Sequence, residues 1–143
     1  GSARMIEAMH EAVKTALFSK TGTSPDNFTT LVSSQIYDTV GPKNVKTPFV
    51  VWSFDGINVN GSFDDKEIVQ ATLVVMLVTD YTKGTEYHLS ILDALSALRY
   101  YSADIGVGNA DRLNFQLRSI GGIRLEDKYM ISETTLTATS RRT

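Results

Sequence analysis

The 143-residue sequence contains no cysteine. It therefore has no disulfide framework, no thiolate ligands for a zinc site and no cysteine nucleophile. Because proteins of every compartment can lack cysteine, this absence does not indicate where the protein acts. Histidine is also scarce: His10 and His88 are the two in the chain. Being far apart in the sequence, they mark neither a metal cluster nor a base paired with a nucleophile.

An excess of charge of one sign is missing as well. The chain has 14 Lys and Arg against 16 Asp and Glu, a formal net charge of -2. Because nucleic-acid-binding surfaces are usually basic, the composition gives no electrostatic argument for binding nucleic acid. No apolar run approaches ~18 residues, so we expect no membrane span, and no signal peptide is visible. These absences favour a protein that is made and used in a cytoplasm, or in a particle assembled there.

What is present is typical of a folded chain. Hydrophobic residues make up 42% of the sequence and charged residues 21%, as in ordinary globular domains. The length suits one domain that buries a core without metal or disulfide support. We expect Gly1-Ser2-Ala3-Arg4 to be left over from cloning, ahead of a native Met5. The sequence therefore predicts a single domain over residues 5–140.

Hydrophobic periodicity predicts two helices. In residues 5–19, apolar side chains recur at helical spacing, namely Ile6, Met9, Val13, Ala16 and Leu17. Residues 85–101 carry a second stripe that includes Leu92, Leu95 and Leu98. Thr85 is the expected N-cap of this helix, because its hydroxyl can accept a hydrogen bond from a backbone N–H of the first turn.

Strand patterns account for most of the remaining chain. Residues 35–37, 49–54, 68–81, 113–120 and 129–138 are rich in β-branched or aromatic residues, or alternate in polarity. Residues 68–81 are apolar on both faces, which predicts a central strand covered on both sides. Short turns between consecutive strands favour antiparallel pairing. We therefore expect an α+β fold, an antiparallel β-sheet with two main helices packed on one face. It should bury Trp52, Val75, Leu77, Leu92 and Leu95.

The segment 55–66 is predicted to be a loop, because Asp55-Gly56 and Asn60-Gly61 are strong turn dipeptides. Ile57 and Val59 alternate between the two turns. Apolar side chains exposed on a projection often mark a partner surface. Ile57, Val59 and Phe63 are therefore a candidate docking segment. A solvated hairpin that merely connects two strands fits the same pattern.

No other pattern indicates chemistry. We expect His10 and His88 to be surface or half-buried side chains, whose replacement by alanine leaves folding nearly intact. Asp64-Asp65-Lys66-Glu67 offers carboxylates for a divalent ion, but its spacing does not match a calcium loop and favours a solvated strand entry. Gly106-Val107-Gly108 lacks the further glycines or lysine of a phosphate loop. The sequence thus predicts no catalytic, cofactor-binding or metal-binding residue, and we expect a protein that is not an enzyme.

One motif carries a resemblance. Gln35-Ile36-Tyr37-Asp38, followed by Pro42 and by Pro48-Phe49-Val50-Val51, resembles a pattern in tail-completion proteins of tailed bacteriophages. This family is also described as head–tail joining or tail-terminator-like. The order of expected elements from Met5 to about residue 140 is similar as well, whereas segment 55–66 looks like an insertion. The resemblance implies a structural subunit that completes or caps the tail tube and joins it to the head connector.

The resemblance also implies partners. It implies a ring of identical subunits, with sixfold symmetry expected, that contacts a tail tube protein and a head connector protein. The location would be the virion tail or neck, with assembly in the host cytoplasm. Two alternatives stay open: another phage structural role, such as tail tube or minor capsid protein, and, less favoured, a small ligand-binding domain or enzyme.

Overall fold

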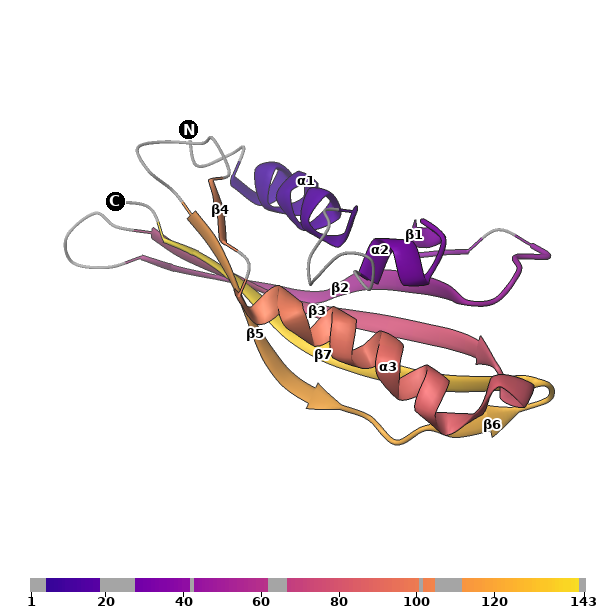
Figure 1. The fold of residues 1–143 in the computed structure, drawn as a ribbon. Coiled ribbons are helices and arrows are strands. Elements are labelled where there is room, and N and C mark those ends of the chain that lie inside the picture. The colour runs from indigo at the N-terminus through magenta and orange to yellow at the C-terminus, as the bar shows by residue number, and fades with distance from the viewer. Residues whose placement is uncertain are drawn as a thin grey trace.

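A computed structural model describes residues 5–18, 28–41, 43–61, 67–100, 102–104 and 112–141, and Figure 1 shows the arrangement of their helices and strands. The helical elements are α1 (Met5–Phe18), α2 (Phe28–Leu31), the 3-10 turn η2 (Tyr81–Lys83), α3 (Gly84–Ser96) and the 3-10 turn η3 (Ala97–Tyr100). The strands are β1 (Ile36–Asp38), β2 (Phe49–Gly61), β3 (Glu67–Asp80), β4 (Ser102–Asp104), β5 (Arg112–Ile120), β6 (Arg124–Glu126) and β7 (Tyr129–Arg141).

The strands form one sheet with the order β1-β2-β3-β7-β5-β4, and β6 also pairs with β7. All pairs are antiparallel except β1 with β2, which is parallel. The α+β class holds, but the expectation of a purely antiparallel sheet is wrong at this edge. The cause is the connection 39–48, which returns the chain along β1 before β2 begins, so that both strands run in the same direction.

Both predicted helices are present. The α1 stripe is buried as expected, with Met9, Val13, Ala16 and Leu17 removed from solvent, although Ile6 remains 43% exposed. Helix α3 begins at Gly84, so the expected N-cap Thr85 lies inside the helix, and Lys83 at the cap position makes no side-chain capping bond. The preceding turn η2 is capped instead, because Asp80 Oδ1 accepts a hydrogen bond of 2.9 Å from the backbone N–H of Thr82.

One face of the sheet carries the core. Alternate β3 side chains are buried, namely Val69, Ala71, Leu73, Val75, Leu77 and Thr79. On α1, the His10 ring lies 5.2 Å from that of Trp52, whose β2 position pairs with Val75. On α3, His88 hydrogen-bonds Thr79. Because Val75 and Thr79 share one face of β3, both contacts lie on that face. We call it the covered face and the opposite one the open face.

The expectation that residues 68–81 are covered on both sides is wrong over most of the strand. The open-face side chains Thr72, Val74 and Met76 are half-buried, whereas Val78 on the same face is buried. Cross-strand neighbours such as Val51, which pairs with Met76, shield them in part. The five side chains predicted to be buried are buried, namely Trp52, Val75, Leu77, Leu92 and Leu95.

The predicted loop 55–66 is also wrong over much of its length. Strand β2 runs on to Gly61, which pairs with Glu67 at the start of β3. Asp55-Gly56 is not a turn but a bulge, where the register between β2 and β3 shifts. Pairing with a long apolar strand outweighs the local turn preference here. The short elements α2 and β4 went unpredicted, because three or four residues show no periodicity.

Candidate functional site

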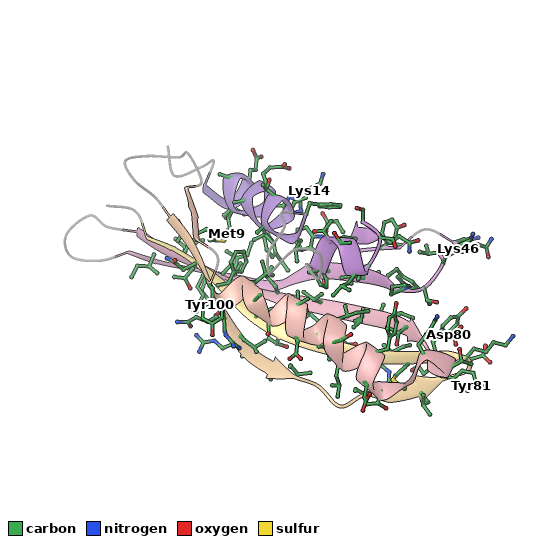
Figure 2. All side chains as sticks on the ribbon, in the orientation of Figure 1. Met9, Lys14, Lys46, Asp80, Tyr81 and Tyr100 are labelled. Carbon is green, nitrogen blue, oxygen red and sulfur yellow. The ribbon has the colours of Figure 1, made fainter. Side chains whose placement is uncertain are left out.

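Helix α1 borders two adjoining hollows in the surface. The first, about 390 Å³, is lined by Ile6, Glu7, His10, Glu11 and Phe54. The second, about 370 Å³, is lined by Glu11, Lys14, Thr15 and Phe18. Figure 2 shows Met9 on the sheet side of α1 and Lys14 on the far side. Each hollow places apolar side chains beside charged ones.

We call the exposed α1 residues Ile6, Glu7, Glu11, Lys14 and Phe18 the α1 outer face. Its two large apolar side chains are 43% and 39% exposed. Sequence reasoning missed this face, because it assigned Ile6 to the core stripe and gave no role to the phenylalanine that ends the helix. The signal was present, since that phenylalanine lies off the buried stripe.

His10 lines the first hollow and connects helix α1 to the sheet. Its Nε2 lies 2.7 Å from Asp38 Oδ2, and its Nδ1 lies 3.7 Å from Glu11 Oε1. Its ring also contacts Trp52 and, edge-on at 5.6 Å, Phe54. With a side chain 34% exposed, His10 is half-buried, as expected. These contacts give it a structural role that fixes α1 against β1 and β2.

His88 is not a surface residue, contrary to expectation. It is fully buried, its Nδ1 lies 2.7 Å from Thr79 Oγ1, and its Nε2 lies 2.7 Å from Ser132 Oγ. Burial lowers the pKa of His88, because the charged imidazolium loses its hydration. Although a serine hydroxyl bonded to histidine is the arrangement of a nucleophile with its base, both residues are sealed from solvent. The trio joins α3 to β3 and β7.

The remaining sequence candidates lie mostly outside the described part of the chain. Asp64, Asp65, Lys66, Gly106 and Gly108 lie outside the described residues, and Glu67 begins β3. Among the residues that the structure describes, no three His, Asp or Glu side chains are grouped closely enough to hold a metal ion. In the same part of the chain, no helix has both the length and the apolar character needed to span a membrane.

The structure describes two of the three candidate docking residues, and these two differ in solvent exposure. Ile57 is partly buried against the core rather than exposed. Val59, two residues on and therefore on the same face of β2, is 51% exposed. Phe63 lies outside the described residues. Of the two described residues of this set, Val59 is the one that leaves about half of its apolar side chain exposed.

Comparison with known proteins gives a likeness of fold. No family model matches the sequence, and no curated protein does either. Among solved structures, the chain is similar to one described as "Virion of native gene transfer agent (GTA) particle", with a TM-score of 0.61 and 19% identity. The likeness covers 90% of this chain and 91% of that one. At this identity, what the two chains share is the fold.

Proposed function

We propose that the protein is a structural subunit of a tailed phage or phage-derived particle, which completes or caps the tail tube and joins it to the head connector. The observation that carries the proposal is the fold shared with a chain of a gene transfer agent virion, over 90% of one chain and 91% of the other. That likeness supports a virion structural protein. The motif resemblance narrows the role to tail completion.

The residues of the motif support an architectural role. Ile36, Tyr37 and Asp38 form β1 and pair with residues 50–52 of β2. Asp38 also binds His10 of α1 through its carboxylate. The motif therefore links the edge of the sheet to the first helix.

The titratable groups support a non-enzymatic role. His10 is tied to Asp38, and His88 is enclosed with Thr79 and Ser132. The imidazole of His88 is closed off from solvent, and that of His10, which lines the first hollow, is engaged by the Asp38 carboxylate. As a subunit the protein would form a ring of identical copies, sixfold in symmetry, between a tail tube protein and a head connector protein. It would reside in the virion tail or neck after assembly in the host cytoplasm.

Val59, near the end of the β2–β3 hairpin, is a contact point for such a partner. Its isopropyl group is half exposed, and an aspartate there would place a charge in an apolar contact. Leu125 on β6, which is 66% exposed, offers a matched control on another strand.

Electron microscopy of the purified protein, alone and mixed with tail tubes, tests the proposal. We expect sixfold rings at tube ends, fewer of them with Val59→Asp, and unchanged numbers with Leu125→Asp. Tubes that never carry the protein, at any concentration at which both stay soluble, would refute the tail-completion role. Normal capping by Val59→Asp would refute the hairpin contact alone.

A further inference from the structure

The α1 outer face has the composition of a contact surface but lacks a partner within the described chain. Ile6 and Phe18 leave 43% and 39% of their surface exposed. Neither Glu7 nor Lys14 takes part in an ion pair among the described residues. Two hollows open beside the same helix and share Glu11. The exposed residues of α1 thus stand apart from its core residues Met9 and Val13, which are fully buried.

The central charges of this face, Glu11 and Lys14, are complementary to their own reverse. Apolar residues stand at both ends, Ile6 and Phe18, which a rise of about 1.5 Å per residue places about 18 Å apart. Between them, an acidic Glu11 precedes a basic Lys14. When a second such helix lies antiparallel about an axis between residues 12 and 13, its Glu11 faces Lys14 of the first, and its Phe18 lies level with Glu7 and one residue from Ile6.

We propose that the α1 outer face binds the same face of a second copy, antiparallel and about a two-fold axis near residues 12 and 13. Lys14 of each copy then lies opposite Glu11 of the other. Phe18 of the second copy reaches the hollow of about 390 Å³ floored by Ile6 and Phe54. Because the contact is isologous, each pairing occurs twice and closes a dimer without forming a chain of subunits.

The contact is small. One helix face buries less surface than the roughly 1,200 Å² of a stable interface, so the dimer should be weak and concentration-dependent. The complementary charges set the antiparallel register more than they raise affinity. This dimer is separate from the proposed virion role. A ring needs two different contact surfaces on each subunit, whereas a two-fold dimer uses one surface twice. Dimer formation is measured on the isolated protein, whereas the virion role is measured with tail tubes. A failure of one proposal can therefore be told from a failure of the other.

Charge reversal with mixing gives the decisive test. Glu11→Lys places lysines opposite lysines in a homodimer, and Lys14→Glu places glutamates opposite glutamates. Each variant alone should weaken self-association about tenfold, which corresponds to about 1.4 kcal/mol. In an equimolar mixture, the lysine pair of one variant faces the glutamate pair of the other, so heterodimers should regain wild-type affinity. Sedimentation equilibrium measures all three samples.

Two further variants separate the contact from effects on folding. Phe18→Ala should weaken the dimer at least tenfold, whereas Tyr100→Ala, at a side chain 77% exposed on another element, should leave it unchanged. Thermal unfolding of the charge variants should match the wild type, because exposed substitutions usually alter stability by less than about 0.5 kcal/mol.

Cysteine pairing gives a second readout of the register. Since the chain has no cysteine, the thiols of Glu11→Cys and Lys14→Cys would be unique. A mixture of these variants should oxidise to a crosslinked heterodimer faster than either variant alone. The proposal is overturned if the wild type stays monomeric at millimolar concentration, if single charge reversals leave the dimer intact, or if mixing restores nothing.

Discussion

Replacing His88 with phenylalanine would remove two hydrogen bonds from the core while keeping a ring of similar size. His88 accepts or donates at both ring nitrogens, at 2.7 Å from Thr79 Oγ1 and 2.7 Å from Ser132 Oγ. All three residues are fully buried. The phenyl ring has no polar atom, so both hydroxyls would be left without the imidazole in a site closed to water.

The expected loss follows from those two hydroxyls. Leaving a buried donor or acceptor unpaired costs about 1–3 kcal/mol. Two of them cost roughly 2–6 kcal/mol, which burial of the less polar ring offsets in part. We expect His88→Phe to lower the free energy of unfolding by about 2–4 kcal/mol, a large share of the 5–15 kcal/mol typical of a domain.

A triple variant tests whether the unpaired hydroxyls cause the loss. Adding Thr79→Val and Ser132→Ala to His88→Phe removes them, and apolar replacement of all partners can be nearly neutral. The triple variant should regain at least half of the lost stability. Urea unfolding is convenient to follow, because Trp52 is the single tryptophan and is 1% exposed. A single variant as stable as the wild type, or a triple variant no better than the single, would refute the reasoning.

Three further predictions concern stability. Because burial holds the pKa of His88 below its ordinary 6.5, the unfolded chain binds a proton first as pH falls. The free energy of unfolding should therefore drop below about pH 6.5, by up to about 1.4 kcal/mol per unit until the folded pKa is reached, and His88→Phe should abolish this slope in urea titrations at several pH values. The Thr134 hydroxyl is buried without a hydrogen-bond partner among the described residues, so Thr134→Val should stabilise by about 1 kcal/mol in urea unfolding. Thr137→Val, which loses a 3.1 Å bond from an arginine, should instead destabilise by about 1 kcal/mol. An added Cβ at Gly121 would lie 3.0 Å from a carbonyl oxygen of the facing strand, whereas one at Gly122 would meet nothing within 4 Å. Gly121→Ala should thus lower the melting temperature, at a cost of about 1–3 kcal/mol, and Gly122→Ala should leave it nearly unchanged.

Hydrophobic periodicity in the sequence correctly predicted helix α1 and strand β3. The stripe of α1 follows from burying one face of an amphipathic helix, and β3 was predicted as a strand, although its second face was wrongly expected to be covered throughout. Segment 55–61 escaped the same reasoning, because Asp55-Gly56 has the local chemistry of a turn. Only the pairing of β2 with β3, a contact between separate segments, turns that dipeptide into a bulge.

His88 shows a different limit. It stands three and four residues before Ile91 and Leu92, both buried, so its place on the inner stripe of α3 was readable from spacing. Its partners were not, because Thr79 lies on β3 and Ser132 on β7. A buried polar side chain requires hydrogen-bond partners. Only the folded arrangement shows which hydroxyls of this threonine- and serine-rich sheet supply them.

The two opposite sides of α1 allow folding and association to be altered independently. Met9 and Val13 face the core with no exposed surface, so truncating either should cost stability in the manner of any core cavity. Glu11 and Lys14 are exposed and stand outside the core, and the 3.7 Å contact of Glu11 with His10 is a surface pair of small energetic weight. Reversing their charges should therefore leave the unfolding transition nearly in place. A change in association without a change in unfolding therefore assigns the contact to the outer face. A change in both would instead place the cause in the packing of α1 against the sheet, where His10 holds it to Asp38.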